Sequence, residues 1–372
     1  VRDGGNPQDY QEYPQRAINN GPSAFHFPQN LSPQLFQTIT YRQGGQLKQA
    51  SLSDFLVATQ TTSFIVIKDG VILDESYANG YTRDSLVTSE SDAKSVTSAL
   101  IGIAIHESYI GSEQDRMVSY LPEMRGKGLD EVTIRDLLTM SSGINFTYAD
   151  ELPVLGLLPL NDNARSTNYP DLRGFALGLR PSADAPGTAF SYSNAPPLLL
   201  GMILERTTHR WVSQYLQEKI WQPLGMEYPA SWSLDSTQSG FEKMAMGLNA
   251  RAIDFAKFGQ LYLDNGAWNG QQIVPAQWVL ESTAPDPTNS LPWRNGTPWK
   301  QADGYYGYLW WGQTRPDGTY VYMARGGHNV GQLQWIYVSP KDRVVIVCYG
   351  LVDGSVDWWP DVFQAVTDAV SR

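Results

Sequence analysis

Two short apolar runs near residue 70 carry the clearest local pattern in the chain. Residues 63–68 read SFIVIK and residues 71–73 read VIL, so both runs are rich in β-branched side chains. Asp69 and Gly70 separate the runs, and Asp-Gly tolerates the positive φ angles of a type I′ turn. The pattern therefore predicts a β-hairpin over residues 63–73.

A helix buried on all sides is predicted next, over residues 91–106. Apolar residues fall on nearly every face of this segment, which is typical of a helix inside a protein. Amphipathic patterns predict further helices over residues 133–140, 198–206, 211–220, 252–263, 275–282 and 358–370. Apolar runs predict strands over residues 319–324, 332–338 and 344–349.

The order of these elements predicts an α+β fold, with strands at both ends of the chain and helices between them. The connections between residues 319 and 349 are short, which favours an antiparallel sheet. We expect three regions: an extended, proline-interrupted arm, an α/β domain in two pieces and a mainly helical domain, over residues 1–60, 61–110 with 246–372, and 111–245. An active site would lie between the two domains.

The composition indicates a globular protein that does not bind nucleic acid. The 372 residues are 42% hydrophobic and carry a net charge of −11, which would repel a phosphate backbone or an anionic membrane surface. No apolar stretch approaches the ~18 residues needed to span a bilayer. The four histidines are scattered and the single cysteine, Cys348, sits in an apolar run, so neither a metal site nor another cofactor is expected.

The start of the chain bears on the cellular compartment. The sequence begins at Val1, with neither a Met nor a charged-then-apolar leader, which suits a processed export product or a shortened chain. We expect an exported bacterial protein, periplasmic or secreted, with a cytoplasmic location as the alternative. The oligomeric state is left open.

A serine and a lysine lie one helical turn apart at the start of the predicted buried helix. Ser91 and Lys94 share a helix face in the motif SDAK, so the hydroxyl and the amine can meet. Burial disfavours the ammonium form, and a neutral lysine can take the proton of a serine hydroxyl and make it a nucleophile. Chance alone produces such a spacing about once in a chain of this composition, but burying an unpaired lysine would cost several kcal/mol.

Two further segments carry groups that could serve the same site. Tyr192 and Asn194 lie in a turn before an apolar helix, where they could relay a proton and donate a hydrogen bond; a packed aromatic turn is the alternative. Residues 326–332 are rich in glycine and precede a strand, and their N–H groups could bind an oxyanion. An ordinary turn is the alternative there.

Together these motifs resemble those of the serine β-lactamase and penicillin-binding-protein superfamily, in the class C-like branch with the family VIII carboxylesterases and the 6-aminohexanoate-dimer hydrolases. The resemblance covers most of the chain beyond residue 60 and includes longer stretches at residues 132–143, 252–261 and 306–311. It implies the fold of that superfamily, an antiparallel sheet flanked by helices with a mostly helical second domain, and no cofactor.

The resemblance also implies a role for each motif residue. Ser91 would be the acylated nucleophile, Lys94 its general base, and Tyr192 the group that passes the proton to the leaving atom and later activates water. Asn194 would orient Lys94 and the substrate carbonyl. The oxyanion hole would combine the N–H of the nucleophile with an N–H near Gln334, on the strand that borders the site.

The third motif of the superfamily departs from its usual sequence. It is Lys-Thr-Gly, or His-x-Gly in the esterases, and counting back from Pro340 places it at residues 332–334, which read QLQ. Either a bulged loop returns His328 to the site, or Gln332 has replaced it. These positions lack the cation with which β-lactamases of this superfamily hold the carboxylate of the drug.

The sequence therefore predicts a serine hydrolase that cleaves a small-molecule ester or amide through an acyl-enzyme. The missing cation favours a carboxylesterase-like enzyme that prefers short, uncharged acyl esters and has weak or no β-lactamase activity. Two alternatives are a penicillin-binding or peptidoglycan-interacting protein on the same fold, and an amide hydrolase of the 6-aminohexanoate-oligomer type. An α/β-hydrolase is excluded because no Gly-x-Ser-x-Gly occurs in the chain.

Overall fold

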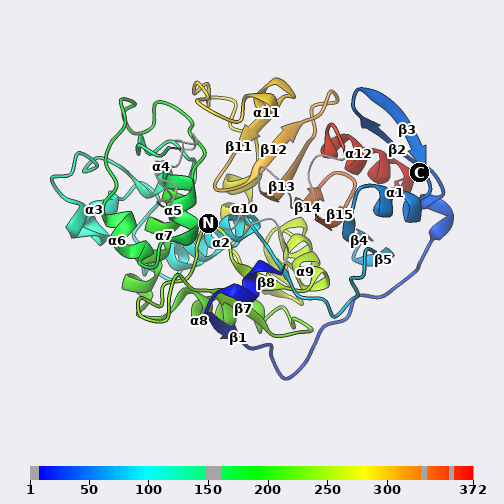
Figure 1. Ribbon diagram of the computed structural model, residues 1–372, viewed down its shortest axis with the longest axis horizontal. Coiled ribbons are helices and arrows are strands. Elements are labelled where there is room, and N and C mark those ends of the chain that lie inside the picture. The colour runs from blue at the N-terminus through cyan, green and yellow to red at the C-terminus, as the bar shows by residue number, and fades with distance from the viewer. Residues whose placement is uncertain (1–7, 148–160, 328–332, 352–355, 372) are drawn as a thin grey trace, which may run out of the picture.

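An antiparallel sheet of seven strands, assembled from the two ends of the chain, forms the centre of the fold (Figure 1). The computed structural model describes residues 8–147, 161–327, 333–351 and 356–371. Across the sheet the strands follow the order β11 (Gly304–Tyr306), β12 (Trp311–Thr314), β13 (Tyr320–Gly327), β14 (Leu333–Ser339), β15 (Val344–Gly350), β4 (Thr61–Lys68) and β5 (Val71–Tyr77). Because β15 pairs directly with β4, the predicted sheet from both termini is confirmed.

The predicted hairpin joins β4 to β5. Lys68 lies opposite Val71 in the ladder, and the two residues between them, Asp69 and Gly70, have φ angles of 51° and 75°. Both angles are positive, as a type I′ turn requires. The hairpin prediction is therefore confirmed, although the strands extend beyond the apolar runs that predicted them.

Helices cover both faces of the sheet. One face carries α1 (Leu52–Ala58) and α12 (Trp359–Val370), and the other carries α2 (Asp92–His106), α9 (Ala252–Leu263) and α10 (Ala276–Thr283), with α11 (Thr297–Gln301) beside β11. Alternate residues of β14 contact the two layers. The rings of Trp335 and Tyr337 lie 5.6 and 5.3 Å from the ring of Phe363 in α12, whereas Ile336 packs against Gly259 of α9.

A mainly helical part of the chain lies beside this sheet, to the left in Figure 1. It contains α3 (Met117–Tyr120), α4 (Ile134–Leu138), α5 (Asp162–Asn168), α6 (Leu172–Leu177), α7 (Ala195–Thr208) and α8 (Val212–Leu216). The buried apolar side chains of both parts form one continuous core. Within the described residues, no helix is both long and apolar enough to cross a membrane. The boundaries of the expected domains remain a prediction.

A second, four-stranded sheet ties the N-terminal segment to the rest of the molecule. Its strands lie in the order β1 (Gln15–Ile18), β7 (Ala230–Ser233), β8 (Leu248–Ala250) and β6 (Val87–Thr88). A short pair, β9 (Ala267–Trp268) and β10 (Gln271–Gln272), lies elsewhere in the fold. Strand β1 therefore belongs to the same sheet as β6 and β8, the strands that precede α2 and α9.

The first 60 residues are more regular than the extended arm that their prolines predicted. Besides β1 they contain the hairpin of β2 (Ile39–Gln43) and β3 (Gln46–Ala50), followed directly by α1. The side chains of β3 are almost all exposed, so this strand has no alternation of apolar and polar residues by which it could be predicted.

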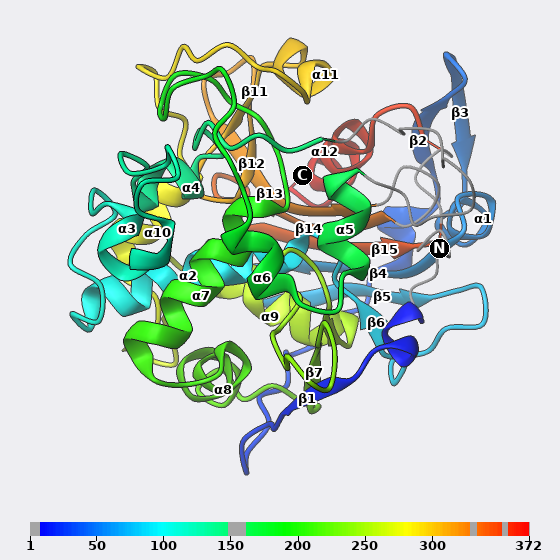
Figure 2. The ribbon, with the colours of Figure 1, turned by 60° about the vertical axis from the view of Figure 1, so that its left-hand side comes forward.

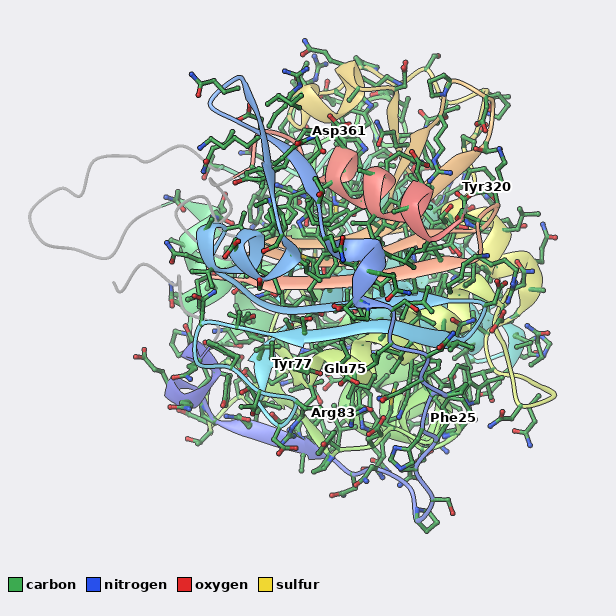
Figure 3. The ribbon with its side chains drawn as sticks, turned by 90° about the vertical axis from the view of Figure 1, so that its right-hand side faces the viewer. Phe25, Glu75, Tyr77, Arg83, Tyr320 and Asp361 are labelled. Atoms are coloured by element: carbon green, nitrogen blue, oxygen red, sulfur yellow. The ribbon has the colours of Figure 1, made fainter. Side chains whose placement is uncertain are left out.

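Strand β5 is covered at its outer edge by residues 28–32 of the N-terminal arm, which form backbone hydrogen bonds with Ile72 and Leu73. Charged side chains add to this cover. Figure 3 labels Glu75, Tyr77 and Arg83 together beside this strand. The Glu75 carboxylate accepts hydrogen bonds from the Tyr77 hydroxyl at 2.8 Å and from Nε of Arg83 at 2.7 Å. Arg83 also pairs with Glu227, which precedes β7. Charged side chains at this edge disfavour pairing with another chain.

Helix α2 is enclosed along nearly its whole length, which confirms the predicted buried helix. Every residue from Asp92 to Ala104 is buried. Gly102 allows α10 to approach closely, because a Cβ at this position would lie 2.4 Å from Cγ of Trp278. The close packing of the two helices therefore depends on the missing side chain.

The substitution Gly102→Ala should lower the free energy of unfolding by about 1–3 kcal/mol, the usual cost of overpacking a core. The loss is expected although alanine is the better helix former by about 1 kcal/mol. Urea unfolding measures the change. In a Trp278→Leu background the same substitution should cost less, and an equal cost in both backgrounds would contradict the proposed contact.

Candidate active site

A pocket of about 540 Å³ opens where the start of α2, helix α5, the start of α7 and the end of β13 meet. Ser91, Tyr192 and Asn194 line this pocket. A larger hollow of about 620 Å³ is lined by Phe190 and Trp293 among others, but by no serine, cysteine or histidine of the described chain. The smaller pocket is therefore the candidate active site.

The sequence-predicted pair meets at the start of α2. Nζ of Lys94 lies 2.7 Å from Oγ of Ser91, and Lys94 is only 1% exposed. Two further oxygens surround the amine, Oδ1 of Asn194 at 2.9 Å and the carbonyl oxygen of Ala245 at 2.9 Å. The described residues place no carboxylate in an ion pair with Lys94.

This set of partners suits a neutral amine. The oxygens of Asn194 and Ala245 can only accept hydrogen bonds, so they take the two N–H groups of a neutral Lys94. The lone pair of the amine is then directed to the hydroxyl of Ser91, which can donate its proton. Burial lowers the pKa of Lys94 to about 7. The geometry and the pKa together describe a base held beside a hydroxyl.

Tyr192 completes the contacts of the Ser91 hydroxyl. Its phenol shares a hydrogen bond with Ser91, and burial raises its pKa to about 12, so it is protonated at neutral pH. Its ring centroid lies 5.0 Å from Nζ of Lys94. The side chain of Asn295 fixes this position, because it accepts from the backbone N–H of Tyr192 at 2.8 Å and donates to its carbonyl oxygen at 2.9 Å.

The amide of Asn194 is oriented by helix α5. Its Nδ2 donates to Oδ1 of Asn163 and to Oγ of Ser166, both at 3.1 Å, so its Oδ1 is left to accept from Lys94. Sequence analysis missed Asn163 and Ser166. No spacing marks them, because their contact with Asn194 depends on a chain reversal over about thirty residues.

The strand that borders Ser91 is β13, one strand before the one expected. A Cβ at Gly326 would lie 2.5 Å from the carbonyl oxygen of Ser89 and 2.9 Å from the backbone nitrogen of Ser91, so β13 borders Ser91. Gly327, the last residue of β13, lines the pocket. Only glycine permits so close an approach of two backbones.

The expectation for Gln334 is corrected by this placement. Gln334 lies one strand further away, in β14 opposite Gly326, and its fully buried side chain does not line the pocket. Counting back from Pro340 failed because residues 326 and 327 continue a strand instead of forming a turn. His328 and Gln332, the other two candidates, lie outside the described residues.

Arg325 brings a cation to the pocket, which corrects the premise that none is present there. It directly precedes the two glycines in β13 and lines the pocket, with its guanidinium 5.2 Å from the ring centroid of Trp335. The sequence signal for Arg325 is its position directly before Gly326 and Gly327, at the end of the strand that borders Ser91. The predicted preference for uncharged esters therefore loses its physical reason.

The described residues also hold no group of three or more His, Cys, Asp or Glu side chains that could bind a metal ion. The chemistry that the pocket can support with its own side chains is nucleophilic attack by a hydroxyl with an adjacent amine base, a protonated phenol and a nearby cation.

The sequence matches the family described as Beta-lactamase over residues 54–350. A 6-aminohexanoate-dimer hydrolase of Paenarthrobacter ureafaciens is 25% identical over 316 residues, which are 83% of this chain and 76% of the relative. A Bacillus anthracis protein described as a candidate 6-aminohexanoate-dimer hydrolase superposes with a TM-score of 0.82 at 24% identity, over 99% of this chain and 92% of that one. A Streptomyces D-stereospecific amidohydrolase superposes with a TM-score of 0.62 at 20% identity, over 85% and 96%.

The rate at which a neutral fluorophosphonate labels the protein should rise with pH, with a midpoint near the pKa of about 7 that burial gives Lys94. Below the midpoint Lys94 carries its proton and cannot accept another, so the rate should fall about tenfold for each pH unit. Mass spectrometry of labelled protein against time measures the rate. A midpoint close to the ordinary value for lysine would contradict the neutral base.

Proposed function

The chain belongs to the beta-lactamase family, and on that premise we propose that it is a serine hydrolase that cleaves an ester or amide through a covalent acyl-enzyme. That it is a hydrolase with the β-lactamase fold rests on the family match and the relatives. The observation that carries the finer proposal is the single contact between Nζ of Lys94 and Oγ of Ser91 at 2.7 Å.

Acylation begins when the hydroxyl oxygen of Ser91 attacks the carbonyl carbon of the substrate. The proton of the hydroxyl passes to the neutral amine of Lys94, which is held by its two carbonyl partners and needs no reorganisation. Tyr192, with a hydrogen bond to the same hydroxyl, donates a proton to the leaving oxygen or nitrogen and is reprotonated from Lys94. The C–O or C–N bond of the substrate breaks, and an ester of Ser91 remains.

Deacylation repeats the chemistry with water in place of the serine. Tyr192 and Lys94 together remove a proton from the water, the water oxygen attacks the acyl carbon, and Ser91 leaves with its proton restored. Backbone N–H groups stabilise the negative oxygen of both tetrahedral intermediates. One is the N–H of Ser91 and the other belongs to the end of β13, which approaches Ser91 at Gly326.

The cation of Arg325 bears on the substrate. A guanidinium in the pocket favours a substrate that carries a carboxylate, because a charge-assisted hydrogen bond of this kind contributes about 1.5–3 kcal/mol. The relative from Paenarthrobacter is a hydrolase of a 6-aminohexanoate dimer, and a dimer of an amino acid contains both an amide and a carboxylate. We therefore propose an amide or ester with a carboxylate as substrate, in place of the uncharged esters predicted from sequence.

A protein that binds penicillin or peptidoglycan without turnover is the second candidate. The argument for this candidate is the altered third motif, which lacks the usual cation. Arg325 brings a cation to the same pocket, which weakens that argument. The contacts among Ser91, Lys94 and Asn194 favour turnover. A protein that is acylated at Ser91 but releases no product would decide for the second candidate.

Ser91 should be the only residue labelled by the fluorophosphonate, because it is the one serine whose hydroxyl contacts Nζ of Lys94 among the described residues. Ser91→Ala and Lys94→Ala should each lower kcat/KM at least ~10³-fold, and the double variant should lose little more, since parts of one nucleophilic unit are not additive. Peptide mass spectrometry and hydrolysis of p-nitrophenyl butyrate measure both outcomes. An adduct on Ser95 or Ser193 would contradict the assignment.

Arg325→Gln should lower kcat/KM about 10- to 150-fold for substrates with a carboxylate, such as nitrocefin or a linear amino acid dimer. For neutral p-nitrophenyl butyrate the change should stay small, because that ester has no carboxylate to lose. Arg294→Gln is the matched control, since Arg294 also lines the pocket and forms an ion pair with Asp184. Equal losses on charged and neutral substrates would show that Arg325 does not select the carboxylate.

A further inference from the structure

The amine of Lys94 is held by two separate pieces of the chain. The first is the segment over residues 243–246, whose carbonyl oxygen at Ala245 accepts a hydrogen bond from Nζ at 2.9 Å. The second is Asn194, whose Oδ1 accepts from Nζ at 2.9 Å and whose Nδ2 is bound by α5 through Asn163 and Ser166. The position of Lys94 therefore depends on how the 243–246 segment and α5 are placed.

One residue of the N-terminal arm contacts both of these pieces. The hydroxyl of Tyr13 donates to Oδ1 of Asn168, at the last residue of α5, at a distance of 3.0 Å. In the 243–246 segment, Nζ of Lys243 lies 3.0 Å from the centroid of the Tyr13 ring. Such a cation–π contact stabilises the pair by about 0.5–2 kcal/mol, more where water is excluded. Tyr13 thus bridges the two supports of Lys94.

The arm fixes Tyr13 from the adjacent residues. Strand β1 pairs with β7 along its full length, as Figure 2 shows at the lower edge of the molecule. The backbone N–H of Leu234 donates to the carbonyl oxygen of Pro14 at 2.7 Å. Arg16 forms an ion pair of 2.6 Å with the fully buried carboxylate of Glu242. Tyr13 therefore lies two residues before β1, next to the contacts that fix this strand to the rest of the protein.

We propose that Tyr13 is a positioning residue of the active site, which holds α5 and the 243–246 segment at the spacing that keeps Lys94 against Ser91. This inference rests on the proposed role of Lys94 as the base. Tyr13 does not touch the pocket, so it acts only through the partners of Lys94. The N-terminal arm then belongs to the catalytic architecture and is more than a covering of the core.

Loss of the Tyr13 contacts has two expected consequences. The amine of Lys94 moves relative to Ser91, and a misplacement on the order of 1 Å can cost ~10²-fold in rate. Water also gains access to the amine, so its pKa rises towards the ordinary value for lysine. The carboxylates that act on Lys94 are Glu90 and Asp92, before and within α2, and Tyr192 and Arg325 lie nearby. Lys243, two residues before Ala245, is the charged side chain of this segment that contacts Tyr13.

The experiment compares Tyr13→Phe, Tyr13→Ala and the matched control Tyr10→Phe, which removes a hydroxyl from the same arm. For p-nitrophenyl butyrate, Tyr13→Ala should lower kcat at least ~10-fold with KM changed less than ~2-fold, and Tyr13→Phe should lower kcat about threefold. The pH midpoint of fluorophosphonate labelling should move upward in the same order. Tyr10→Phe should match the unmodified protein in all three quantities.

A second variant tests the contact from the other side. Asn168→Ala removes the acceptor of the Tyr13 hydroxyl, so its effect and that of Tyr13→Phe should not add in the double variant. A Tyr13→Phe enzyme with unchanged kcat and pH midpoint would overturn the inference, as would fully additive effects with Asn168→Ala. Activity that survives Lys94→Ala would instead overturn the proposed function, so the two failures are distinguishable. Circular dichroism identifies a variant that is unfolded, and Tyr13→Phe then decides alone.

Discussion

The active site depends on the burial of one amine that forms no ion pair with a carboxylate of the described residues. Lys94 is 1% exposed, and its hydrogen-bond partners among the described residues are a hydroxyl and two carbonyl oxygens. An ammonium group there would lose its hydration without gaining an ion pair with any of them. The neutral form avoids this cost, and it is also the form that can accept a proton. The same desolvation that makes this position unfavourable for a charged lysine makes it suitable for a base.

Keeping water from this amine requires a helix enclosed on all sides. Helix α2 lies between the sheet and the helical part of the chain, and its core contacts include α7, α10 and β13. Glycines permit the closest of these approaches, at Gly102 towards Trp278 and at Gly326 towards Ser91. The sheet and the helices therefore bury α2, and Ser91 lies at the start of this helix, where it lines the pocket.

The parts of this arrangement that could be predicted from sequence are those encoded over a few residues. The Asp69-Gly70 turn and the helical spacing of Ser91 and Lys94 need only local geometry, and both take the expected form. The strand that borders the site was misplaced because two glycines fit a turn as well as a strand that approaches another backbone, and only the neighbouring Ser91 distinguishes the cases. Asn163 gives no local signal, because its contact forms only when α5 lies beside Asn194, the residue that precedes α7.

The proposed reaction needs two basic side chains in opposite states and assigns them to different residue types. A base must lose its proton near neutral pH, and lysine does so readily when buried, as Lys94 is. A group that holds a carboxylate must stay charged, and the guanidinium of arginine retains its proton in proteins, which suits Arg325 at the half-buried end of β13. In a protein of net charge −11, attraction of an anion has to come from such a local charge rather than from the overall field. Lysine at position 325 and arginine at position 94 would therefore remove both the proposed base and the proposed carboxylate-binding group.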